Sequence, residues 1–105
     1  MNDYVKVGSV GELQLGQSKI VEVEDVRIAI FNLDGELYAI EDVCTHDGAP
    51  LYNGDIVEGC QIECPRHGAR FNIKTGAAVR MPAFVPIETY EVRIEGEDVF
   101  VKAPF

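Results

Sequence analysis

The segment Cys44–Gly68, which reads CTHDGAPLYNGDIVEGCQIECPRHG, contains both histidines and all three cysteines of this chain. Each histidine follows a cysteine closely, in the motifs CTH at 44–46 and CPRH at 64–67. Two thiolates and two imidazoles brought to one place suit either zinc or an iron–sulfur cluster. The spacing alone does not choose between these two metals.

The same segment is rich in glycine and proline, which favour turns over regular strands. We therefore expect loops over residues 43–69, set on a sheet formed by the flanking chain. On a turning loop both side chains of each motif can point to one place, whereas a flat strand would point Cys64 and His67, three residues apart, to opposite faces. Cys60 lies outside both motifs, in an expected strand at 59–63, and is interpreted as a small apolar core residue.

Apolar residues on either side of this segment alternate with polar ones, which predicts β-strands and an all-β fold of antiparallel sheets. The strands are expected at Tyr4–Val7, Ser18–Val23, Arg27–Leu33, Glu36–Glu41, Gln61–Glu63, Ala69–Asn72, Glu88–Ile94 and Asp98–Lys102. Hairpin turns are predicted at 34–35, 74–76 and 95–98. Helix is limited to one turn near 10–13, and no repeat or linker divides the chain, so residues 1–105 should form a single domain.

The charge balance bears on which binding partners are expected. Nine basic and 18 acidic residues among 105 give a net charge of −9, with no basic run. We therefore expect no binding to nucleic acid or to anionic membranes. No apolar stretch has the length of a membrane span, and residues 1–4 do not resemble a signal peptide, so a cytoplasmic location is expected. An odd number of cysteines in that compartment indicates ligands rather than a disulfide scaffold.

Taken together, the two motifs resemble the cluster-binding boxes of Rieske [2Fe–2S] proteins. The resemblance extends to Gly48 and Pro50 after the first box, to GARF at 68–71 and to Thr75-Gly76. It covers essentially the whole chain and is strongest to the small soluble Rieske-type ferredoxins, which consist of the cluster domain alone. It implies a Rieske-type fold, with a small cluster-binding subdomain of loops.

The resemblance also implies the ligands. Cys44 and Cys64 would bind one iron as thiolates, and His46 and His67 would bind the other as neutral imidazoles, with one [2Fe–2S] cluster per chain. The segment 81–86, Met-Pro-Ala-Phe-Val-Pro, corresponds to the proline-containing loop that covers the cluster in this family. An ordinary irregular connection is the alternative interpretation of that segment.

Several positions depart from the high-potential Rieske proteins of respiratory complexes. Those proteins have a disulfide between the boxes, where this chain has Ala49 and Arg66, and hydroxyl donors where it has Ala69 and Phe71. Arg66 is interpreted as a surface charge beside the cluster. Because hydrogen bonds to cluster sulfurs favour the reduced state, their loss predicts a low reduction potential.

The family implies an electron carrier rather than an enzyme, because both histidines are committed to the cluster and no mononuclear iron site follows. The expected role is to pass electrons from a flavoprotein reductase to a terminal oxygenase, as a monomer whose acidic surface approaches a basic patch. Supply of electrons to iron–sulfur cluster assembly or to other redox partners is the alternative. A zinc-stabilised interaction module and the small subunit of a nitrite reductase are further alternatives.

Overall fold

A computed structural model describes residues 3–14, 17–45, 48, 50–66, 68–81 and 84–102. Its elements, in chain order, are β1 (Tyr4–Ser9), the 3₁₀ turn η1 (Val10–Glu12), β2 (Ser18–Val23), β3 (Val26–Leu33), β4 (Glu36–Glu41), β5 (Ile56–Val57), β6 (Gln61–Glu63), β7 (Arg70–Asn72), β8 (Ala78–Arg80), β9 (Thr89–Tyr90), β10 (Val92–Glu95) and β11 (Asp98–Lys102). The expectation of an all-β fold of antiparallel sheets is confirmed. No helix in the described ranges is long and apolar enough to cross a membrane.

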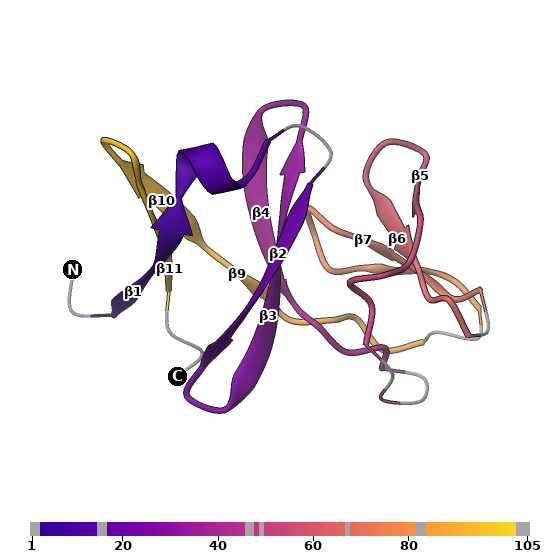
Figure 1. Cartoon of the computed structure of the whole chain (residues 1–105). Coiled ribbons are helices and arrows are strands. Elements are labelled where there is room, and N and C mark those ends of the chain that lie inside the picture. Colours follow the sequence, from indigo (N-terminus) through magenta and orange to yellow (C-terminus); the bar gives the residue numbers. More distant parts are fainter. Residues whose placement is uncertain are drawn as a thin grey trace.

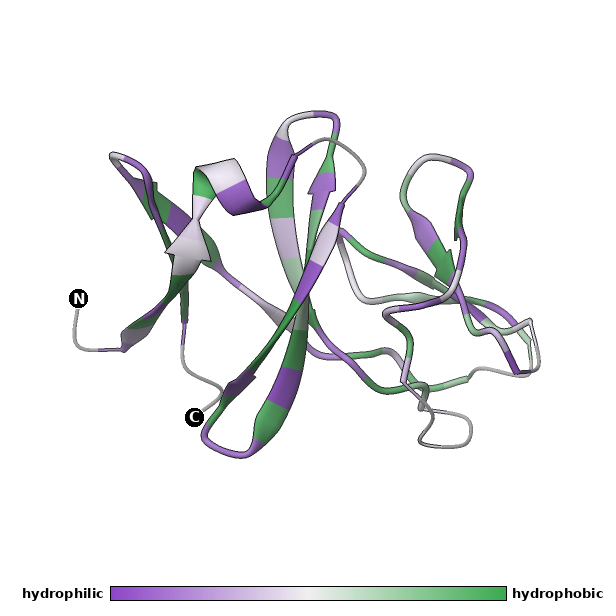
Figure 2. Cartoon of the chain, viewed as in Figure 1, coloured by the Kyte–Doolittle hydropathy of each residue, from purple (hydrophilic) through white to green (hydrophobic). Residues whose placement is uncertain are grey.

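Three antiparallel sheets follow one another along the molecule (Figure 1). The middle sheet has the order β2-β3-β4-β9, with β1-β11-β10 on one side of it and β5-β6-β7-β8 on the other. Strand β3 is largely hydrophobic, and the turn that joins β2 to β3 is hydrophilic (Figure 2). Glu24 and Asp25 occupy this turn with positive φ, which a two-residue hairpin connection requires.

The central strand β3 is buried on both faces, which explains why six consecutive residues from Ile28 to Leu33 are inaccessible to solvent or nearly so. Ile28 and Ile30 pack in one core with residues of β11 and β4. Ala29, Phe31 and Leu33 pack in a second core with residues of β6 and β7. Strict alternation therefore sends neighbouring residues of β3 into two different cores.

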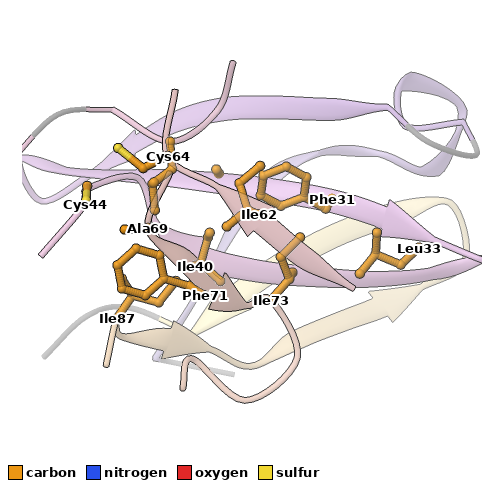
Figure 3. Packing of buried hydrophobic residues seen from close by; sticks show 12 residues of the cluster. Phe31, Leu33, Ile40, Cys44, Ile62, Cys64, Ala69, Phe71, Ile73 and Ile87 are labelled. Carbon is orange, nitrogen blue, oxygen red and sulfur yellow. The ribbon is translucent and has the colours of Figure 1, made fainter. Parts of the chain in front are cut away.

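The sheet β5-β6-β7-β8 is small and carries the second core at its centre. Ile62 pairs with Phe71 across β6 and β7, and both side chains are fully buried. Figure 3 shows these two residues with Ile73 and Ile87, and the cysteines Cys44 and Cys64 at one end of the same cluster. The expected loops on a sheet are thus found as a subdomain packed against the middle sheet.

Three expectations about the strands need correction. The strand expected over Glu88–Ile94 is interrupted at Glu91, because β9 pairs with β4 whereas β10 has moved to the neighbouring sheet to pair with β11. Cys60 lies in a turn, so it is not part of the strand expected at 59–63, and β6 begins at Gln61, two residues later. The short strands β5 and β8 were not expected, because two or three residues are too few to show an alternation.

Candidate metal centre

The two loops that carry the motifs hold their cysteines in the same backbone geometry. The carbonyl oxygen of Cys44 accepts a hydrogen bond from the N–H of Gly48 at 2.7 Å, and that of Cys64 accepts one from Gly68 at 3.0 Å. Both glycines have positive φ, 77° and 75°, a conformation that residues with a Cβ atom rarely adopt. Each motif is therefore wound into one tight turn that ends at a glycine.

Both cysteines are buried at the end of the core that faces these loops. Cys44 is 0% exposed and Cys64 is 1% exposed. Figure 3 shows their sulfur atoms close together, with Ala69 beside them, although the two residues belong to different loops. None of the three cysteines is in a disulfide. The fold therefore brings two soft sulfur ligands to one place, which suits an iron–sulfur cluster.

His46 and His67, expected as the remaining ligands, lie outside the described residues. In the part of the chain that is described, no group of three or more histidine, cysteine or acidic side chains could hold a metal ion. A four-residue ligand set therefore depends on the two histidines, which follow the buried cysteines by two and three residues in the sequence.

A buried carboxylate closes the first loop. The side chain of Asp42 is inaccessible to solvent, and its Oδ1 accepts hydrogen bonds from the backbone N–H groups of Leu51 and Tyr52, each at 2.8 Å. Its other oxygen, Oδ2, accepts a hydrogen bond from the guanidinium of Arg27 at 3.0 Å. Asp42 thus ties both ends of the first loop together and fixes where Cys44 enters the core.

A second contact holds the segment that follows β8 against the first motif. The Thr45 hydroxyl donates a hydrogen bond of 2.6 Å to the backbone carbonyl of Val85. This contact agrees with the interpretation of 81–86 as a covering loop, although Pro82 and Ala83 lie outside the described residues. Neither Asp42 nor Thr45 was predicted from the sequence as part of the site. An acidic residue at the end of an apolar strand was the only signal for Asp42.

The other residues considered from the sequence lie nearby. Cys60 is half-buried against the core, as expected for a packing residue, and Asn72 Nδ2 lies 3.7 Å from its sulfur. Arg66 is exposed within the second loop, which agrees with its interpretation as a surface charge. Ala69 and Phe71 are completely buried, and the carbonyl of Ala69 accepts a hydrogen bond from the N–H of Cys64 at 2.7 Å.

Comparison with known proteins agrees with this geometry. The sequence pattern of the Rieske [2Fe-2S] domain matches residues 3–91. The 3-phenylpropionate/cinnamic acid dioxygenase ferredoxin subunit of Escherichia coli (strain K12) is 40% identical over 95 residues, which cover 90% of this chain and 89% of the relative.

Two solved structures are similar along nearly their whole length. The Sphingomonas yanoikuyae B1 ferredoxin is 38% identical with a TM-score of 0.87, and the match covers 95% of this chain and 98% of the other. A chain in the complex of reduced oxygenase and oxidized ferredoxin in carbazole 1,9a-dioxygenase is 34% identical with a TM-score of 0.88, covering 97% and 94%. With these matches and the paired cysteine loops, the chain belongs to the Rieske [2Fe-2S] family, among its ferredoxins.

Proposed function

We propose that this protein is a one-electron carrier that receives electrons from a flavoprotein reductase and delivers them to the terminal oxygenase of a ring-hydroxylating dioxygenase. The observation that carries the proposal is that the cluster domain spans residues 3–91, and that 90% of the chain aligns with 89% of a dioxygenase ferredoxin subunit. The protein is an electron-transfer component, and the oxygenase performs the catalysis.

The proposed ligands are Cys44 and Cys64 as thiolates and His46 and His67 as neutral imidazoles, with one [2Fe–2S] cluster per chain. The bound cluster supplies a site that takes up and releases one electron. Two buried cysteines from separate loops fit this donor set, and the family match favours a [2Fe–2S] cluster over the zinc alternative.

The protein part of the site is suited to electron transfer because it is held in one arrangement. The glycine turns fix the backbone at both cysteines, Asp42 closes the first loop and Thr45 joins it to Val85. Such outer contacts orient the ligands and keep their positions the same in both oxidation states. A rigid site reduces the rearrangement that each electron transfer would otherwise require.

The exposed surroundings of the second loop agree with transfer to a protein partner. Arg66 is exposed two residues after Cys64 in the sequence. Phe84 is also exposed, and the residue after it, Val85, is hydrogen-bonded to Thr45 beside Cys44. Complexes between electron carriers and their partners are usually small and short-lived. We accordingly propose a monomer that works in the cytoplasm and alternates between its two partners.

Reconstitution tests this function. The purified holoprotein would be combined with NADH, a flavoprotein reductase, the oxygenase component of the Escherichia coli 3-phenylpropionate/cinnamic acid dioxygenase, and 3-phenylpropionate. Substrate should be consumed only when the carrier is present. Cys44→Ser should abolish consumption, whereas the matched variant Cys60→Ala should support it fully. Reduction of the carrier without substrate consumption would reject an oxygenase of this class as its acceptor.

A further inference from the structure

The charge of this protein is divided unevenly along the chain. Residues 60–85 contain four basic residues, Arg66, Arg70, Lys74 and Arg80, and one acidic residue, Glu63, which gives +3. The rest of the chain contains five basic and 17 acidic residues, which gives −12, and the two parts sum to −9. The part that includes the second motif is therefore positive in a strongly acidic protein.

The cross-strand pairing gathers part of this positive charge beside Cys64. Glu63 pairs with Arg70 across β6 and β7, and Arg70 pairs with Arg80 across β7 and β8. One oxygen of Glu63, Oε2, lies 2.8 Å from Arg70 Nε and 3.7 Å from Arg80 Nη1. Two guanidinium groups thus share one carboxylate, and the trio carries +1 at the residue that precedes Cys64.

Exposed apolar side chains follow immediately after Arg80. Met81 is 67% exposed, Phe84 75% and Val85 59%. The hydrogen bond from Thr45 to the carbonyl of Val85 holds this segment against the first motif. Large apolar side chains that gather beside a redox site are typical of the centre of a protein interface. Met81 directly follows Arg80 in the chain, so the apolar segment begins where the basic strand β8 ends.

We propose, resting on the proposed function, that a docking face formed by Arg66, Arg70, Arg80, Met81, Phe84 and Val85 receives the terminal oxygenase. The partner that fits this face has an apolar recess for Phe84 bordered by carboxylates, the opposite of the basic patch that the net charge alone predicts. The sheet β1-β11-β10 lies at the other end of the molecule (Figure 1). Its acidic hairpin is repelled by the same carboxylates, which turns the docking face toward the partner.

Small charged oxidants test the local charge without any protein partner. The reduced holoprotein would be oxidised by hexacyanoferrate(III), which takes one electron and becomes hexacyanoferrate(II), in a stopped-flow instrument. A positive docking face attracts this anion, so we expect the rate to fall as ionic strength rises from about 0.01 M to about 0.1 M. For the cation tris(phenanthroline)cobalt(III), which one electron reduces to its cobalt(II) form, the rate should rise over the same range.

Charge reversal at two arginines separates local charge from net charge. Arg80→Glu at the docking face and Arg93→Glu on β10 each change the net charge from −9 to −11. At low ionic strength Arg80→Glu should slow hexacyanoferrate(III) by about threefold or more, with Arg80→Gln intermediate and Arg93→Glu close to wild type. Equal effects of Arg80→Glu and Arg93→Glu, or a wild-type rate that rises with salt, would overturn the inference.

Broadening of amide signals gives a second readout that involves no electron transfer. Hexacyanochromate(III), a paramagnetic anion, would be added to the oxidised holoprotein, and relaxation of the amide signals would be compared between β8 and β10. The inference requires stronger broadening along β8 and its loss in Arg80→Glu. Uniform broadening, or broadening confined to other surfaces, would contradict it.

The apolar part of the docking face is tested with the oxygenase used above. Phe84→Ser should raise the ferredoxin concentration needed for half-maximal oxygenase reduction by about fivefold or more, because an aromatic side chain at an interface centre contributes strongly to binding. Its matched control is Ile94→Ser, which removes an exposed apolar residue from β10. Equal values for the two variants would overturn the docking face. A wild-type protein that never reduces the oxygenase would overturn the proposed function instead.

Discussion

Cys44 and Cys64 have equivalent backbone environments, since each carbonyl accepts a hydrogen bond from the N–H of the glycine four residues later. In the sequence, the expected histidine ligands lie between each cysteine and its glycine, two residues after Cys44 and three residues after Cys64. The two halves of the site therefore use one local structure on two unrelated loops. This equivalence makes both glycines testable.

Gly68→Ala should destabilise the protein by about 1–2 kcal/mol, because a left-handed backbone is costly for a residue with a Cβ atom. The position has open space for a methyl group, so the cost is conformational rather than steric. Gly68→Asn should lose less, because asparagine tolerates this conformation better. Chemical denaturation would measure the three proteins, with Gly11→Ala as the control. Equal stability of Gly68→Ala and Gly68→Asn would contradict the explanation.

Replacement of any proposed ligand should remove most of the iron. In His67→Ala and in Cys64→Ser the purified protein should contain little iron and acid-labile sulfide and should unfold more easily, because the bound metal also stabilises the loops. Cys60→Ala is the matched control and should retain the full content of both elements. Full iron content in the double variant His46→Ala with His67→Ala would disprove the proposed ligand set.

Asp42→Ala should reduce the free energy of unfolding by about 2 kcal/mol or more. The change leaves the buried backbone N–H of Leu51 and the partly buried N–H of Tyr52 without their acceptor, and a buried donor left unpaired costs about 1–3 kcal/mol. Thermal unfolding of the holoprotein would measure the loss. Glu22→Ala removes an exposed carboxylate from β2 and is the control. A midpoint shared by Asp42→Ala and Glu22→Ala would show that Asp42 does not hold the loop.

The sequence was sufficient to predict the features that a local pattern specifies, namely the first three strands of the middle sheet and the two cysteine–histidine motifs. Short apolar and β-branched runs bounded by turn residues indicate β2, β3 and β4, so these strands were predicted within one residue of their ends. The cysteines were recognisable because a thiol two or three positions before a histidine, repeated once, is a specific pattern.

Features that depend on tertiary contacts could not be predicted in this way. Whether the chain between Glu88 and Glu95 stays in one sheet depends on which neighbours, β4 or β11, offer free backbone groups at each position. The role of Asp42 depends on the position of Leu51 and Tyr52 beside it in the folded chain, which no local sequence pattern predicts. The net charge likewise does not indicate that Arg70 and Arg80 both contact Glu63.

Stability at alkaline pH should depend on Tyr90. Partial burial, followed by the charges of Glu41 and Glu88, raises the pKa of Tyr90 to about 12 from its ordinary value of 10.0. In the unfolded chain this tyrosine loses its proton near pH 10, whereas in the folded protein it keeps the proton until about pH 12. Its contribution to stability is therefore complete below pH 10 and is lost as the pH rises to about 12.

Tyr90→Phe should accordingly flatten the fall of the unfolding free energy between pH 10 and about 12. Denaturation with urea at a series of pH values would measure this, and the absorbance of tyrosinate would follow the titration directly. Tyr52→Phe is the control, since Tyr52 is an exposed tyrosine. The same slope for wild type and Tyr90→Phe would refute the assignment.

The reduction potential should lie near the lower end of the Rieske range of about −150 to +300 mV. Ala69 and Phe71 are completely buried at the cysteine end of the core and offer no hydroxyl group. A hydrogen bond to a cluster sulfur stabilises the extra negative charge of the reduced state, so each absent donor lowers the potential. For one electron, 59 mV corresponds to about 1.4 kcal/mol, which is the size of one such bond.

Addition of both donors in the double variant Ala69→Ser with Phe71→Tyr should therefore raise the potential by about 50–150 mV. Ala77→Ser with Phe100→Tyr adds the same two hydroxyl groups away from the cysteines and should leave the potential unchanged, so it separates a local hydrogen bond from a general change in polarity. Direct voltammetry on the three holoproteins decides between them. A wild-type potential well above zero would contradict the explanation. So would a double variant that folds, keeps its cluster and places both hydroxyls within bonding distance of sulfur without an upward shift.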